Sequence, residues 1–147
     1  MEQNRGFAPT PDVAAILHNL LDQYERRQDP QARVIRCDLE GLDRLLSHAH
    51  TLLRPGGRLL FDSLDVRCTD TPVHLAYQEA NRRAGRYVGQ IRMQFAYRSR
   101  MGPPFDWLHV DPYTLAEHAG RLGWSCRVVR QEENGDYLAQ LTPVVGA

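Results

Sequence analysis

Residues 52–67, with the sequence LLRPGGRLLFDSLDVR, constrain the fold of this chain more than any other segment. Proline cannot continue a helix and glycine accepts left-handed backbone angles, so Pro55-Gly56-Gly57 ends the amphipathic helix before it. The unbroken apolar centre Leu59-Leu60-Phe61 then predicts a parallel strand, from Arg58 to Ser63, that is covered on both faces. Ligands of open α/β sheets bind outside the carboxyl ends of the strands, which makes Asp62 and Asp65 candidates for a binding crevice.

Length and composition indicate an ordinary globular protein. The chain has 147 residues, enough for one domain, of which 42% are hydrophobic and 24% charged. No stretch approaches the roughly 18 apolar residues of a membrane helix, and the polar N-terminus is not a signal peptide, so we expect a cytoplasmic protein. Eighteen basic residues balance eighteen acidic ones, so net charge favours neither nucleic acid nor a membrane as a partner.

The metal-ligating residue types show no pattern of a metal site. Cys37, Cys68 and Cys126 are widely and irregularly spaced, which is typical of reduced, structural thiols. His48 and His50 are two residues apart in a predicted helix, about 200° around its axis, so they cannot share one ion. We therefore expect no metal.

Hydrophobic periodicity and capping residues predict four helices. Thr10 and Pro11 begin the first, which ends before Gln28, and Asp38 caps a second that runs to Pro55. The second helix is expected to bury Leu42, Leu45, Leu46, Ala49, Leu52 and Leu53. Residues 72–83 form a third helix, and Asp111-Pro112 opens a fourth that buries Leu115, Ala116, Ala119 and Leu122 and ends at Gly123.

Further strands are predicted from apolar runs and from strict alternation. Ile91, Met93, Phe95 and Tyr97 alternate with polar residues, as in a half-buried antiparallel strand. The chain is then expected to turn at residues 101–104 and to pair back. The remaining predicted strands are 32–37, 105–110, 125–131 and 137–142, and the last two flank an Asn-Gly turn.

This order of elements resembles the C-terminal half of class I S-adenosylmethionine-dependent methyltransferases. The likeness rests on GLDRLLSHAHTLLRPGGRLLFDSLDVR and GPPFDWLHVDPYTLAEHAGRLGWSCRVVRQEENGDYLAQLT, and it covers residues 39–143. It implies an α/β fold, namely a partial Rossmann-like methyltransferase sheet with flanking helices and a C-terminal antiparallel hairpin. Residues 39–147 would form this region, and residues 1–38 a separate N-terminal helical segment.

The chain departs from the family where the cofactor should be held. The family places a glycine-rich turn after its first strand and an acidic residue after its second. Here the forty residues before the match contain one glycine, Gly6, and they are too few for the missing strands, since each βαβ unit needs about 30 residues. We therefore expect a truncated methyltransferase-like protein, weakly active or inactive alone, and we assign no residues to S-adenosylmethionine.

The resemblance and the residue chemistry together give the candidate site. Asp62, Asp65 and Arg67 at the strand end are candidates for contacts to a small-molecule methyl acceptor. Residues 105–107, which are Phe105, Asp106 and Trp107, lie where the family's insert closes over the acceptor. His109 is the candidate general base, because an unperturbed imidazole titrates near neutral pH.

Two functions of other classes remain open. A truncated sheet would expose the edge of the strand at residues 58–63, so the protein could be a non-catalytic module that dimerises or complements a partner chain. Six arginines between Glu79 and Phe105, with aromatic residues among them, could alternatively bind an anion or RNA. These arginines are Arg82, Arg83, Arg86, Arg92, Arg98 and Arg100.

Overall fold

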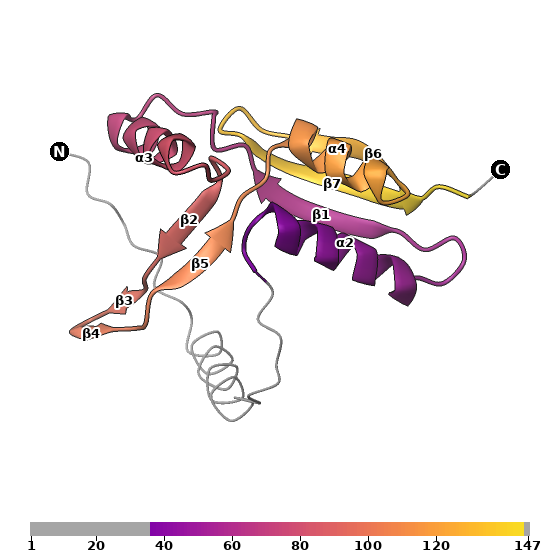
Figure 1. Cartoon of the computed structure of the whole chain (residues 1–147), viewed down its shortest axis with the longest axis horizontal. Helices are drawn as coiled ribbons and strands as arrows, with labels where there is room; N and C mark the ends of the chain where they lie inside the picture. The colour runs from indigo at the N-terminus through magenta and orange to yellow at the C-terminus, as the bar shows by residue number, and fades with distance from the viewer. Residues whose placement is uncertain (1–35, 146–147) are drawn as a thin grey trace. The chain divides into compact units, whose positions relative to one another are not determined.

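The computed structural model describes residues 36–145 (Figure 1). The chain divides into two units, Met1–Val34 and Ile35–Ala147, and the described residues belong to the second. The predicted helix beginning at Pro11 lies outside the described residues, as does most of the predicted strand at 32–37. Arg36 and Cys37, the described end of that strand, are not in a strand.

Helix α2, Leu39–Leu52, begins at the predicted cap. The side chain of Asp38 accepts a hydrogen bond from the Gly41 amide at 2.8 Å, which satisfies one of the free N–H groups of the first turn. Leu42 and Leu46 are buried as expected, whereas Leu45 and Leu52 are exposed, which corrects the predicted stripe. Leu39, Ala49 and Leu53 are partly buried against the same core, so the packed face of the helix follows a spacing of three and four residues.

Strand β1, Leu59–Leu64, follows the predicted turn, in which Gly56 has a φ of 76°. It pairs antiparallel with β7, Asp136–Pro143, which in turn pairs antiparallel with β6, Trp124–Gln131. The predicted parallel strand with two covered faces is therefore wrong for the described residues. There β1 is an end strand of the sheet, and Leu60 is 59% exposed.

The core lies between this three-stranded sheet and two helices, α2 and α4, Pro112–Arg121 (Figure 1). Both helices contribute to one cluster with alternate residues of β7, so they lie on the same face of the sheet. The cluster contains Leu42, Leu46, Val110, Leu115, Ala119, Trp124, Tyr137, Ala139 and Leu141. Ala116, which was expected to be buried in α4, is exposed, and Leu122 is half-buried.

Polar contacts fix these layers in register. The Trp124 indole donates to the Leu46 carbonyl at 3.2 Å, and His118 of α4 contacts Asp43 of α2 at 2.6 Å. The Ser63 hydroxyl accepts from the Val110 amide at 3.0 Å, so the end of β1 is tied to the segment that leads into α4.

An insert of one helix and two hairpins joins β1 to α4. Helix α3, Pro72–Arg83, matches its prediction, and β2, Gln90–Met93, pairs antiparallel with β5, Phe105–Leu108. Beyond them β3, Ala96–Tyr97, pairs with β4, Arg100–Met101. The predicted turn at 101–104 is wrong, because the chain reverses at Arg98-Ser99, where Arg98 has a positive φ of 54°. The alternating strand also ends early, and Phe95 and Tyr97 are exposed.

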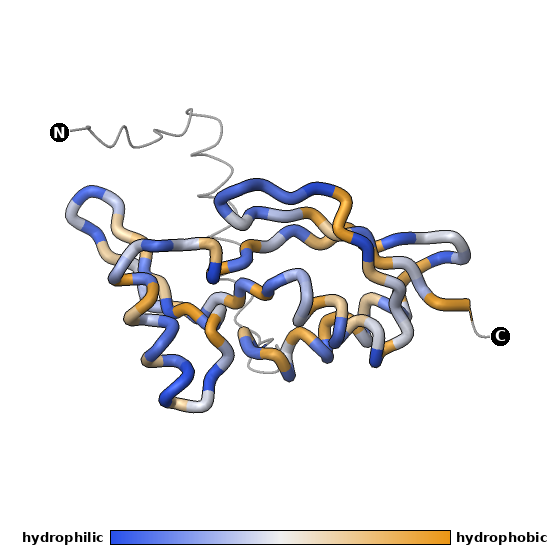
Figure 2. Tube along the Cα trace, turned by 90° about the horizontal axis from the view of Figure 1, so that it is seen from above, coloured by the Kyte–Doolittle hydropathy of each residue, from blue (hydrophilic) through white to orange (hydrophobic). Residues whose placement is uncertain are grey.

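The two terminal strands, β6 and β7, and the loop between them match their predictions to within one residue at each end. Figure 2 shows the β6–β7 loop in hydrophilic colours and the chain beyond β7 in hydrophobic ones. None of the helices within residues 36–145 is long and apolar enough to cross a membrane.

Candidate functional site

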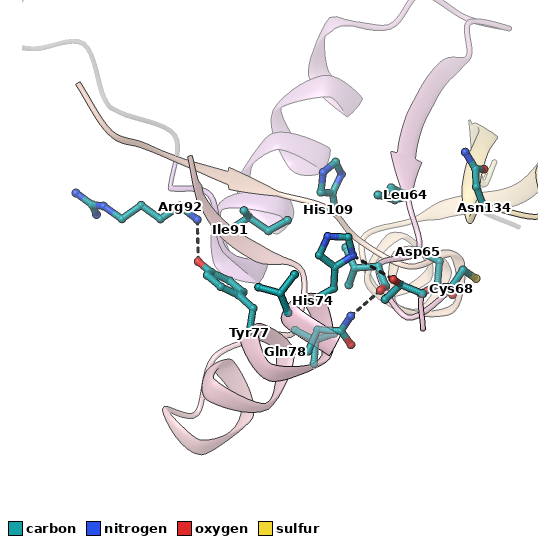
Figure 3. Close-up of a pocket in the computed structure, with 14 residues that line it drawn as sticks. Leu64, Asp65, Cys68, His74, Tyr77, Gln78, Ile91, Arg92, His109 and Asn134 are labelled. Atoms are coloured by element: carbon teal, nitrogen blue, oxygen red, sulfur yellow. Dashed lines mark hydrogen bonds between the residues drawn. The ribbon is translucent and has the colours of Figure 1, made fainter. Parts of the chain in front are cut away.

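A cavity of about 560 Å³ opens beside the carboxyl end of β1 (Figure 3). It lies between the β1–α3 connection, α3, β2 and the loop between β6 and β7. Its volume is within the range of about 300–1,000 Å³ that is typical of small-molecule sites. The lining residues are Leu64, Asp65, Val66, Cys68, Thr69, Val73, His74, Tyr77, Gln78, Val88, Ile91, Arg92, His109 and Asn134.

Asp65 lines the cavity but is bound by its neighbour. Its Oδ1 accepts from the Arg67 backbone amide at 3.0 Å and from the Arg67 Nε at 3.1 Å. The Arg67 Nη2 also contacts Asp111 at 2.6 Å, and these partners together raise the pKa of the guanidinium, the hydrogen bond to Asp65 most strongly. Arg67 is therefore a bridge between two carboxylates and does not line the cavity.

Asp111 is the most densely bonded side chain behind the site, and it is 1% exposed. It caps α4 by accepting from the Thr114 amide at 3.0 Å, and it also accepts from the hydroxyls of Thr114 and Tyr87. Burial alone would raise the pKa of its carboxyl, but these hydrogen bonds and Arg67 outweigh burial and lower the pKa. Burial raises the pKa of Tyr87 to about 12, so its hydroxyl stays a donor to Asp111.

Helix α3 is held by buried polar residues instead of apolar ones. Gln78 donates to the Val66 carbonyl at 2.6 Å, and Asn81 donates to the carbonyls of Val88 and Gln90 at 3.3 and 2.8 Å. Both side chains are buried. These bonds fix α3 against the β1–α3 connection and β2, which are the walls of the cavity.

His109 reaches the cavity from the end of β5. Its backbone amide donates to the Gly89 carbonyl at 2.9 Å, and a Cβ at Gly89 would lie 1.8 Å from the His109 carbonyl oxygen, so only glycine permits this approach. Burial lowers the pKa of the imidazole, against the opposing charges of Asp136 and Asp62, and favours the neutral ring. A neutral imidazole has one nitrogen that donates and one that accepts.

His74 and Tyr77 were missed by the sequence analysis. His74 Nδ1 lies 3.1 Å from the Thr69 hydroxyl, and the Tyr77 hydroxyl oxygen accepts from the Arg92 amide at 3.0 Å. The available signal was a histidine in the first turn of a predicted helix followed by a tyrosine three residues later, which share one helix face. A surface helix gives the same pattern, so the sequence did not distinguish them.

Of the seven predicted site residues, the cavity brings together Asp65 and His109. Asp62 is an exposed residue of β1 whose charge still acts on His109. Phe105, Asp106 and Trp107 form β5 but do not line the cavity. The Trp107 ring lies between two other rings: its centroid is 6.4 Å from that of Phe105 and 6.2 Å from that of His109.

Most arginines of the insert have partners in the described structure. Arg82 and Arg83 pair with Glu79 at 3.4 and 3.0 Å, and Arg92 pairs with Asp106 at 3.3 Å. Arg86 donates to Asn81 at 3.0 Å, and the Arg98 guanidinium lies 5.3 Å from the centroid of the Tyr97 ring. Binding of an anion or RNA by this segment remains a prediction.

None of the three cysteines, Cys37, Cys68 and Cys126, forms a disulfide bond. Cys68 is exposed at the cavity, whereas burial raises the pKa of Cys37 and, in β6, of Cys126. Residues 36–145 contain no group of three or more histidine, cysteine, aspartate or glutamate side chains able to hold a metal ion.

The described residues provide no glycine cradle for the nucleotide cofactor of the resembled family. Such a cradle needs glycines that let the backbone approach a ligand. The tightly packed glycines of this region instead approach carbonyl groups of the protein: Gly41, Gly57, Gly89 and Gly135 approach those of Arg36, Arg54, His109 and Asp65, respectively. Because glycine has no side chain, these positions accommodate neighbouring backbone of the same protein and not a ligand.

A solved structure is similar to this chain. It is the crystal structure of an S-adenosylmethionine-dependent methyltransferase from Bacteroides fragilis in complex with S-adenosyl-L-homocysteine, with 28% identity and a TM-score of 0.57. The match covers 74% of this chain and 43% of that one, so this chain spans less than half the length of its neighbour. No family model and no curated protein match the chain. The described residues therefore have a methyltransferase-like mixed α/β fold.

Proposed function

We propose that residues 36–145 form the acceptor-binding side of an S-adenosylmethionine-dependent methyltransferase. The observation that carries the proposal is the position of the cavity: it lies at the carboxyl end of β1, in a fold similar to a methyltransferase solved with S-adenosyl-L-homocysteine. Asp65 and His109 would contact the acceptor, and the Arg67–Asp111 bridge would hold the strand end in place. Phe105 and Trp107 would support His109 from β5.

The chain by itself would bind the cofactor weakly. The described residues supply the wall that faces the acceptor and no backbone cradle for the nucleotide. Binding free energy would therefore come from a few contacts at the strand end, which is consistent with a Kd of about 1 mM or weaker.

Nuclear magnetic resonance of the ¹⁵N-labelled whole chain tests this function. S-adenosyl-L-homocysteine should shift the amide signals of Ser63–Val66 and His109, without reaching saturation, while adenosine alone should leave them in place. Unchanged signals in a folded sample would contradict the proposal. Saturable one-to-one binding would contradict the weak affinity and would mean that the chain holds a complete cofactor site.

A second candidate function is assembly through the free edge of β1. In the described residues β1 has β7 on one side and no strand on the other, and its sequence LLFDSL has no proline or lysine to discourage pairing. The edge would pair with a second copy or with a partner chain that carries the cofactor-binding part. The two functions are compatible, because a partner at this edge would lie next to the strand that leads to the cavity.

A further inference from the structure

The side chains of α3 are distributed in an unusual way. A surface helix normally buries its apolar stripe and exposes its polar residues. Helix α3 does the opposite: it buries Gln78 and Asn81, while Val73 is 69% exposed and Tyr77 is also exposed. Val73 and Tyr77, one turn apart, both line the cavity. The helix therefore presents its apolar face to the cavity.

The other walls of the cavity are also apolar. Leu64 and Val66 come from the end of β1 and the segment after it, and Val88 and Ile91 come from β2 and the turn before it. An apolar cavity of this size exposes surface whose removal from water is favourable, at about 25 cal/mol per Å². A ligand that fills it should itself be largely apolar.

Charges at the cavity are already paired with protein groups. Asp65 is bound twice by Arg67, and the Arg92 guanidinium pairs with Asp106. Figure 3 shows the Arg92 side chain extending away from the other labelled residues. A charged ligand would lose its hydration without gaining a free counter-charge from the described lining residues, so the cavity favours an uncharged one.

His109 supplies a polar group that is not used within the described protein. Its ring contacts Trp107 edge to face, but its nitrogen atoms make no hydrogen bond among residues 36–145. The Tyr77 hydroxyl accepts one hydrogen bond and retains its own hydrogen, and the second nitrogen of His74 is also unengaged. These groups come from two walls, α3 and the end of β5 (Figure 3). They suit a ligand hydroxyl, which both donates and accepts.

We propose that the cavity binds an uncharged, largely apolar molecule with a hydroxyl group that donates a hydrogen bond to the His109 ring. Burial lowers the pKa of His109, which keeps an accepting nitrogen on the ring at neutral pH. This inference rests on the proposed function in one respect, namely that the bound molecule is the methyl acceptor. Binding itself requires no cofactor.

A set of four naphthalene compounds tests the ligand class on the whole chain by calorimetry at neutral pH. 2-Naphthol should bind in the cavity, and 2-methoxynaphthalene, which cannot donate, should bind about tenfold more weakly. The anion 2-naphthoate and the cation 2-naphthylmethylammonium should bind more weakly than 2-naphthol. Equal affinity for 2-naphthol and its methyl ether, or tighter binding of either ion, would overturn the proposal.

Variants locate the binding. His109→Phe keeps a ring but removes the acceptor, so it should lower 2-naphthol affinity about tenfold and abolish the preference over the methyl ether. His48→Phe, at an exposed position of α2, is the matched control and should change neither. Val66→Trp should fill the cavity and abolish binding of all four compounds. Unchanged binding in both His109→Phe and Val66→Trp, each shown to be folded by its amide spectrum, would contradict the site.

The outcome separates this inference from the proposed function. Selective 2-naphthol binding without any effect of S-adenosyl-L-homocysteine would support the ligand class and contradict the methyltransferase role. An effect of S-adenosyl-L-homocysteine at the end of β1 without selectivity for 2-naphthol would support the methyltransferase role and contradict the ligand class.

Discussion

Asp111 combines three tasks in one buried side chain: it caps α4, accepts from Tyr87 and pairs with Arg67. Removing its charge leaves the Thr114 amide, the Tyr87 hydroxyl and Arg67 with a weaker or missing partner. The sequence identified Asp111 as the start of a helix from the Asp-Pro pair. It did not indicate Tyr87 or Arg67 as partners, because these are 24 and 44 residues away in the chain.

Asp111→Asn should lower the free energy of unfolding by about 3 kcal/mol, as expected for one member of a buried ion-pair network. Urea denaturation monitored by tryptophan fluorescence measures this. Asp70→Asn, at an exposed aspartate, is the control and should change stability by less than about 0.5 kcal/mol. Equal effects of the two substitutions would contradict the role of Asp111.

The wild-type protein should also lose stability in acid through Asp111. Its pKa is lower in the folded chain than the ordinary value of 3.8, so the folded state binds fewer protons there. This stabilisation is fully present above pH 3.8 and is lost as the pH falls through the lowered pKa. Asp111→Asn should reduce that part of the pH dependence, measured as urea midpoints along a pH series.

His109 should titrate below the ordinary histidine value of 6.5, because burial disfavours its charged form. Asp62 of β1 and Asp136 of β7 oppose this shift, and His74 of α3 shares the cavity. The unfolded chain binds the proton more readily, so stability from His109 is present above pH 6.5 and is lost as the pH falls. Side-chain resonances followed through a pH titration give the pKa directly, and a midpoint at or above 6.5 would be inconsistent with burial of this ring.

The β6–β7 loop and the segment after β1, which both line the cavity, approach each other closely at Gly135. Gly135, in the β6–β7 loop, has a φ of 97°, and a Cβ there would lie 2.6 Å from the Asp65 carbonyl oxygen. That carbonyl belongs to the segment just after β1, whose Asp65 amide donates to the Gly135 carbonyl at 2.9 Å. The hairpin loop and the end of β1 are thus packed backbone against backbone.

Gly135→Ala should destabilise the protein by about 2–3 kcal/mol, since steric overlap adds to a strained backbone angle. Gly85→Ala is the matched control: Gly85 also has a positive φ, of 67°, but open space around it, so about 1 kcal/mol is expected. Urea denaturation of both variants measures the difference. A loss at Gly85 as large as that at Gly135 would mean that the contact with Asp65 is unimportant.

At the scale of the whole molecule, the free edge of β1 predicts association. We expect the chain at micromolar concentration to form a dimer or larger species by light scattering, because the edge of β1 that faces away from β7 pairs with no strand in the described residues. Leu60→Lys should shift the species toward monomer by placing a charge on this strand. Leu52→Lys, at an exposed leucine of α2, should have no such effect. A monodisperse wild-type monomer would contradict assembly through this edge.

Local sequence chemistry determined much of the secondary structure. Asp38 and Asp111 fixed two helix starts, Pro55-Gly56-Gly57 ended a helix, and residues 72–83 became α3 as predicted. Capping and turns act over three or four residues, so they can be read without knowing the fold. The resemblance to methyltransferases in the sequence rested on the order of such elements, and a solved methyltransferase is similar to this chain with a TM-score of 0.57.

Only the tertiary structure decided the site. Contacts between distant segments bury Gln78 and Asn81 and leave Val73 exposed. Such contacts also bring His74 of α3 and His109, at the end of β5, to the same cavity. Helical periodicity cannot show which face of α3 is buried when polar side chains form the anchors. The strand-end rule nominated Asp62 and Asp65, of which Asp65 lines the cavity. The partners of Asp65 and the apolar walls around it come from the packing of α3 and β2 against the end of β1.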